Sequence, residues 1–119
     1  MKKIIVVFLA CFSLGQVAAQ EAIAAYGIGA RGCGEYLEYR KRDDRAAENA
    51  YLNWIDGFFS ARNYYEAGRG GGQIRGDKTN ATVLAYIDKV CRDYPLASVG
   101  WVAKQLADHY AGLAVRPNE

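Results

Sequence analysis

The sequence predicts an all-α fold, a small bundle of three to four helices stapled by one disulfide. Apolar residues recur at the three- and four-residue spacing of a helix over several long segments, and no strand-like alternation is sustained. Glycine-rich or polar stretches separate these segments, as expected of loops between helices. Two of the three cysteines fall within the helical region, where a bond between them would support a small core.

Residues 1–19 have the pattern of a secretory signal peptide, with cleavage expected after Ala19. Lys2 and Lys3 form a positive start, followed by an apolar core too short to span a bilayer and by a small-residue exit. This pattern predicts a soluble protein exported to a bacterial periplasm. A lipoprotein anchored through Cys11 is the alternative, although the residues before this cysteine match a lipobox poorly.

The charge of the exported chain excludes some functions. The full chain carries 15 Lys and Arg against 13 Asp and Glu, so removing Lys2 and Lys3 leaves 13 of each. A formally neutral chain of mixed signs has no global attraction to nucleic acid, and no nucleic-acid partner is expected. No second hydrophobic run approaches the roughly 18 residues of a membrane span, so we expect none in the mature protein.

Cys33 and Cys91 are predicted to form the disulfide. The mature chain is one domain of about 100 residues, and an even cysteine pair in an oxidising compartment is best interpreted as a disulfide. In the chain-entropy model, closing so long a loop contributes about 4 kcal/mol to stability. Free thiols or a metal-binding pair are the alternatives, but two sulfurs alone do not complete a tetrahedral zinc site.

The mature chain divides into a flexible N-terminal segment (20–32), a helical domain (33–113) and a C-terminal tail (114–119). Glycines argue against regular structure in the first segment, and the glycine-rich stretch at 68–78 is expected to be a flexible loop. The predicted helices cover residues 33–42, residues 44–67, a segment from a cap at Asp77, Thr79 or Asn80 to about Pro95, and residues 98–112.

The second predicted helix is the longest and should carry much of the core. It begins at Asp44, a plausible N-cap. Gly57 costs about 1 kcal/mol relative to alanine in a helix interior, so we predict that another helix crosses closely at this glycine. The residues expected on the core stripe are Ala47, Tyr51, Trp54, Phe58 and Tyr65, widened by Ala50, Ile55 and Phe59.

Two glycine motifs resemble nucleotide-binding loops but lack the required context. GIGARG at 27–32 has the dinucleotide spacing, yet it follows a signal-peptide junction and not a strand. GGQIRGDKT at 71–79 approaches a phosphate-binding loop, but Asp77 separates the last glycine from Lys78 and no strand precedes it. We therefore interpret both as ordinary loops and expect no cofactor.

Catalytic and metal-binding constellations are scarce. His109 is the sole histidine and is expected at the surface near the end of the last helix. Ser60 and Ser98 lie outside any nucleophile-elbow pattern. Asp56 lies in an aromatic stretch, but no second carboxylate is placed beside it for acid–base chemistry. The prediction is a protein that is not an enzyme, with no catalytic residue and no metal.

Tyrosine is the side chain that stands out as a candidate for binding. The chain has nine tyrosines and two tryptophans, more aromatic surface than a core of this size can fully bury. Tyrosine is enriched at protein interfaces, although a half-buried ring with a solvated hydroxyl is equally common. The candidate protein-binding residues are Tyr51, Trp54, Phe58 and Tyr65.

Two short motifs resemble the periplasmic proteins of the HdeA/HdeB type, and the similarly built YmgD-like proteins. They are Cys33 to Leu37 (CGEYL), which opens the first helix, and Val90 to Pro95 (VCRDYP), which closes the third. The resemblance covers roughly residues 31–113 and implies a small disulfide-bonded helical fold. For the acid-stress members it also implies chaperone activity, which follows when low pH loosens a dimer. A homodimer and periplasmic client proteins are thus expected partners.

A second resemblance is to the Rap/Tai immunity proteins of type VI secretion. It rests on Trp54 to Phe58 (WIDGF) and on Val102 to Leu106 (VAKQL). Members of that family bind and block peptidoglycan amidase toxins in the periplasm. The leading hypothesis is therefore an acid-stress chaperone, and the alternative is an immunity protein or inhibitor of a cell-wall amidase.

Overall fold

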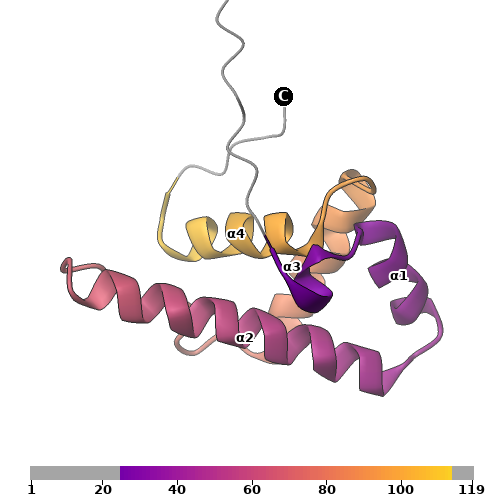
Figure 1. Cartoon of the computed structure of the whole chain (residues 1–119), viewed down its shortest axis with the longest axis horizontal. Coiled ribbons are helices and arrows are strands. Elements are labelled where there is room, and N and C mark those ends of the chain that lie inside the picture. The colour runs from indigo at the N-terminus through magenta and orange to yellow at the C-terminus, as the bar shows by residue number, and fades with distance from the viewer. Residues whose placement is uncertain (1–24, 114–119) are drawn as a thin grey trace, which may run out of the picture.

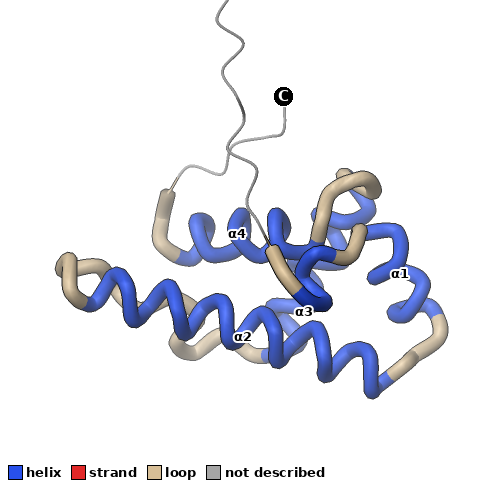
Figure 2. The backbone as a smooth tube through the Cα atoms, viewed as in Figure 1, coloured by secondary structure: helices blue, strands red, loops and turns tan. Residues whose placement is uncertain are grey.

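The computed structural model describes residues 25–113 and confirms the all-α fold. A short 3-10 helix, η1 (Gly27–Ala30), precedes four α-helices, and no strand occurs within the described residues (Figures 1 and 2). The predicted signal peptide (1–19) and C-terminal tail (114–119) lie outside these residues. The helices are α1 (Cys33–Lys41), α2 (Arg45–Ala67), α3 (Asn80–Asp93) and α4 (Val99–Tyr110).

Side-chain caps place three of the helix starts where the sequence predicts them. The Asp44 carboxylate accepts a hydrogen bond from the Ala47 N–H (3.0 Å) at the start of α2. Thr79 is the N-cap of α3, and Ser98 caps α4 in the same way. Each cap satisfies a backbone N–H group that has no partner within the helix.

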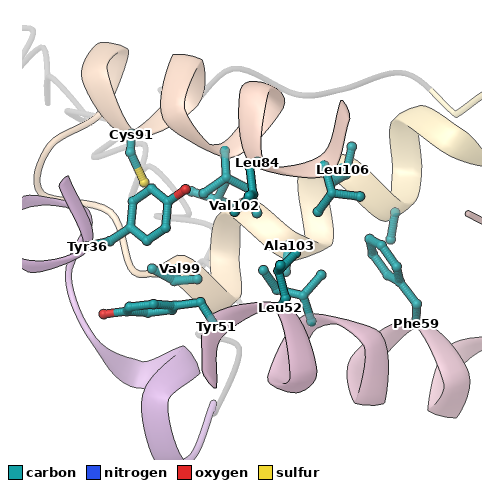
Figure 3. Close-up of a cluster of buried hydrophobic side chains, with 14 of the residues drawn as sticks. Tyr36, Tyr51, Leu52, Phe59, Leu84, Cys91, Val99, Val102, Ala103 and Leu106 are labelled. Atoms are coloured by element: carbon teal, nitrogen blue, oxygen red, sulfur yellow. The ribbon is translucent and has the colours of Figure 1, made fainter. Parts of the chain in front are cut away.

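The core lies where α2, α3 and α4 meet, with α1 closing one end (Figure 1). Tyr51, Leu52 and Phe59 project from α2 towards α4, as Figure 3 shows. The core also extends to α1, because the Tyr36 ring packs edge-on against Tyr51 with centroids 5.0 Å apart. The buried α4 residues on this face include Val99, Val102, Ala103 and Leu106.

The predicted disulfide is confirmed. Cys33 begins α1 and Cys91 lies in the last turn of α3, and their bond joins residues 58 positions apart in the sequence. Both side chains are fully buried. The Cys33 N–H also donates to the Ala97 carbonyl at 2.8 Å, so the start of α1 is fixed both covalently and by hydrogen bonding.

The prediction for the core stripe of α2 is partly wrong. Tyr51, Ile55 and Phe59 are buried as expected, but Ala50 is exposed and Leu52 is buried in its place. Tyr65 is exposed as well, because the end of α2 extends beyond the other helices (Figure 1). The predicted close crossing at Gly57 is also wrong, since no atom of another segment lies within 4 Å of the position of a Cβ there.

Two glycine-rich segments are more ordered than the sequence suggests. Residues 27–30 form η1, in which Gly29 is buried, so the prediction of no regular structure fails for this part of 20–32. The loop after α2 is confirmed as a loop, but Ile74 at its centre is buried. The Asn63 side chain accepts from the Ile74 N–H (2.8 Å) and donates to the Ile74 carbonyl (3.2 Å), which holds the loop against α2.

Candidate protein-binding surface

The structure separates the four predicted binding residues into three environments. Tyr51 is fully buried in the core, so it is not a surface residue in this conformation. Trp54 and Phe58 are half-buried neighbours whose rings stack, with centroids 5.9 Å apart and planes 7° from parallel. Tyr65 lies further along α2 and is 57% exposed. Only Trp54 and Phe58 therefore form a shared surface.

The Trp54 ring is covered by the segment that precedes α1. The Trp54 indole N–H donates to the Tyr26 carbonyl at 2.9 Å. Gly29 lies so close to the ring that a Cβ at this position would be 2.1 Å from the nearest ring carbon. The Trp54–Phe58 pair is thus an aromatic surface with one side closed by backbone.

A second aromatic group lies at the exposed end of α2. Tyr64 is 88% exposed, and the guanidinium of Arg69 lies over the Tyr65 ring, 4.3 Å from its centroid. Tyrosine and arginine are among the residues that dominate binding energy at protein interfaces. Tyr65 was predicted from the sequence as a binding residue but Tyr64 was not, because its exposure depends on how far α2 extends beyond its neighbours.

Within residues 25–113, every side-chain hydrogen bond or ion pair between α2 and another α-helix involves a carboxylate. Arg40 of α1 pairs with Glu48 of α2. Arg62 of α2 pairs with Asp108 of α4 at 2.7 Å. Both contacts are mostly shielded from water, so they are stronger than ordinary surface pairs.

Arg40 also connects α1 to α3 through Asp88. The Asp88 carboxylate accepts from the Arg40 Nε (3.0 Å) and Nη2 (3.1 Å) and from the Tyr36 hydroxyl (2.6 Å). Burial, together with the hydrogen bond to Asp88, raises the pKa of Tyr36 well above its ordinary value. Tyr36 therefore stays a neutral hydrogen-bond donor across the physiological range.

Two further groups have shifted pKa values. Burial of the Asp108 carboxylate acts to raise its pKa, but hydrogen bonds from Lys104 and Arg62 outweigh this effect and hold the pKa below its ordinary value. Burial raises the pKa of Tyr51 to about 12, so its hydroxyl is un-ionised. Asp108 is thus ionised at neutral pH and pairs with the Arg62 guanidinium across the α2–α4 contact.

The residues considered for catalysis lie apart. His109 is exposed near the end of α4, as predicted, and stacks on Tyr86. Asp56 is half-buried and lies 3.0 Å from a guanidinium nitrogen of Arg75, a residue of the loop after α2. Ser60 donates to a carbonyl within its own helix. Within residues 25–113, no three metal-ligating side chains are grouped to hold an ion.

Comparison with known proteins yields no relatives: no family model, no curated protein sequence and no solved structure matches this chain. Among the helices described, none is both long and apolar enough to cross a membrane. The geometry of the helices and of their contacts therefore carries the functional argument.

Proposed function

We propose that this protein is a periplasmic acid-stress chaperone, the activity that its resemblance to the HdeA/HdeB type implies. The supporting observation is how α2 is attached. Its polar contacts with the other α-helices run through Glu48 and Asp108, whereas α1 and α3 are joined by the Cys33–Cys91 bond. Protonation of Glu48 and Asp108 weakens the ion pairs that hold α2 and leaves the disulfide between α1 and α3 intact.

The charge balance of the exported chain also favours loosening of the fold in acid. Without Lys2 and Lys3, the chain has 13 carboxylates and 13 Lys and Arg, and carboxylates have reference pKa values of about 4. At about pH 2.5 most of them are neutral and His109 is protonated, so the net charge approaches about +14. The resulting repulsion opposes a compact domain whose stability is roughly 5–15 kcal/mol.

Loosening of α2 would expose an apolar face. Tyr51, Leu52, Ile55 and Phe59 form that face, and in the closed structure they are buried in the core that α2 shares with the other helices. The disulfide keeps α1 attached to α3, so the chain opens without fully expanding. An exposed apolar face on a still compact chain can bind the apolar segments of unfolding clients.

The chaperone assay measures aggregation of an acid-labile client by light scattering at about pH 2.5, where most carboxylates are neutral. We expect the protein to suppress the scattering in acid and to have little effect at neutral pH, where α2 is held. An equal mass of an unrelated protein serves as the control. The chaperone proposal fails if the protein stays compact in acid, or if it loosens without keeping the client soluble.

Replacing Asp108 with asparagine tests the acid-sensitive contact directly. Because the pKa of Asp108 is lowered in the folded state, its contribution is complete above its ordinary value of 3.8 and is lost as pH falls through the folded value. Asp108→Asn should therefore cost about 1–2 kcal/mol at neutral pH, and this difference should disappear in acid. Urea unfolding across the pH range measures it.

Asp93→Asn is the matched control for Asp108→Asn, because Asp93 pairs with Lys89 on the exposed face of a single helix. Such exposed pairs contribute little to stability, because water and salt screen them. Equal losses for the two variants, or a loss for Asp108→Asn that persists unchanged in acid, would contradict the role given to Asp108.

The end of α2 supports a second candidate, an immunity protein or inhibitor of a cell-wall amidase. Tyr64, Tyr65 and Arg69 form an exposed group that is available without any opening. The test is inhibition of a purified peptidoglycan amidase encoded beside this gene, at neutral pH. Inhibition that is lost in Tyr65→Ala, with no suppression of client aggregation in acid, would favour this function over the chaperone.

A further inference from the structure

The segment that covers Trp54, residues 25–32, is held by backbone hydrogen bonds and by the partly buried side chain of Ile28. We call it the strap; it crosses α2 and the start of α4 (indigo in Figure 1). The Tyr26 carbonyl accepts from the Trp54 indole at 2.9 Å, and the Arg31 carbonyl accepts from the Val99 N–H at 2.9 Å. The Tyr26 side chain itself is 81% exposed. The side chain that the strap does bury in part is that of Ile28, which packs against the core.

Two glycines allow the strap to approach so closely. A Cβ at Gly29 would overlap the Trp54 ring. On the opposite side, a Cβ at Gly100 of α4 would lie 2.7 Å from the Ala25 Cβ and 3.0 Å from the Gly29 carbonyl oxygen. The surface beneath the strap thus accepts a polypeptide segment with a small residue at its centre.

We propose that this surface, formed by Trp54, Phe58, Val99 and Gly100, is a peptide-binding site that the strap occupies in cis. The Trp54 indole and the Val99 N–H donate to backbone carbonyls, which every peptide offers. The stacked Trp54 and Phe58 rings supply apolar contact. The ligand is a short segment that can form a 3-10 turn, as the strap does, with a glycine flanked by aliphatic or aromatic residues, such as an unfolded client exposes.

The strap is suited to displacement. A segment held by a few backbone hydrogen bonds and one partly buried apolar side chain can open locally at a free energy below that of global unfolding. In the closed protein its tether gives it an effective concentration in roughly the millimolar range. A free peptide therefore competes poorly until the strap is released. This role for clients rests on the proposed chaperone function, whereas peptide binding at the site does not.

Gly27→Pro is designed to release the strap without filling the site. Gly27 has φ +65°, which proline cannot adopt, and its side-chain position lies 4.0 Å from the Trp54 ring. Gly32→Val is the matched control in the same segment, because Gly32 has φ −73° and ψ 152° and no atom lies within 4 Å of its Cβ position. Gly29→Val, which overlaps the Trp54 ring, is the second releasing variant.

The probe is a synthetic peptide with the strap sequence AYGIGARG, titrated to millimolar concentration while the Trp54 indole N–H is followed by NMR. Folding of each variant is checked by circular dichroism. We expect the peptide to shift this resonance in Gly27→Pro and Gly29→Val, and to leave it unchanged in the wild type and in Gly32→Val. A peptide with valine in place of its second glycine should not bind.

Each outcome decides the proposal. The cis-occupied site is rejected if the peptide leaves Trp54 unchanged in a folded, strap-released variant. It is also rejected if the peptide binds the wild type equally well, since the strap would then not be a cover. The client assay on Gly27→Pro at neutral pH is a separate arm: suppression there assigns client binding to this site. If the wild type does not suppress client aggregation in acid, the chaperone function is rejected. The peptide titration still tests the binding site in that case.

Discussion

Replacing Cys33 and Cys91 together with alanine is expected to lower the free energy of unfolding by about 4 kcal/mol. The bond closes a loop between residues 58 positions apart, so its removal frees a large conformational entropy in the unfolded chain. Both side chains are fully buried, and alanine avoids placing a hydroxyl in the core. Against a total of roughly 5–15 kcal/mol, the variant is at best marginally folded.

Urea unfolding followed by circular dichroism measures this loss, with the oxidised and the chemically reduced wild type in parallel. The reduced wild type is the matched control, because it lacks the bond and keeps both sulfurs. The two forms without the bond should unfold at similar urea concentrations, with the alanine variant slightly lower through lost packing. If reduction left the midpoint unchanged, the bond would not stabilise the fold.

The helix ends were predictable because their signals are local. Asp44, Thr79 and Ser98 cap the helices that follow them, and each cap depends only on residues a few positions away. The disulfide followed from the expected compartment and from the cysteine count. By contrast, burial along α2 depends on which neighbour covers each turn. The strap covers Trp54, whereas Tyr65 is 57% exposed, so one stripe acquires two environments.

Gly57 and Gly100, which both lie inside α-helices, show why spacing alone misassigned a close contact. A glycine inside a helix indicates close approach of another segment. We predicted such an approach at Gly57, but Gly57 is open to solvent. The same argument holds at Gly100, where Ala25 and Gly29 approach. Sequence alone could not choose between them, because the choice depends on where the strap crosses.

The burial of Ile74 in the loop after α2 could have been predicted from the sequence. Ile74 is the sole large apolar residue between α2 and α3, and a lone apolar residue in a polar loop favours burial. The polar network around Asp88 had no such signal. Its partners Tyr36 and Arg40 lie 52 and 48 positions away, and their meeting depends on how α1 crosses α3.

Replacing Asp88 with alanine is expected to cost about 2–3 kcal/mol, because removing one partner leaves the others buried and unpaired. The variant removes the acceptor for the Tyr36 hydroxyl and for two nitrogens of Arg40. Tyr36 is fully buried and its hydroxyl gains no replacement partner. Because Asp88 and Arg40 are partly exposed, the loss falls below that of a fully buried pair.

Tyr36→Phe and the double variant complete the measurement. Tyr36→Phe removes one hydrogen bond and should cost about 1 kcal/mol, since Asp88 keeps Arg40 as its partner. If the network acts as a unit, the double variant should lose less than the sum of the two single variants, by at least about 0.5 kcal/mol. Urea unfolding of the four proteins gives this coupling energy. Strict additivity would mean that Tyr36 and Asp88 stabilise the α1–α3 contact independently, and the junction beside the disulfide would then not be a single polar network.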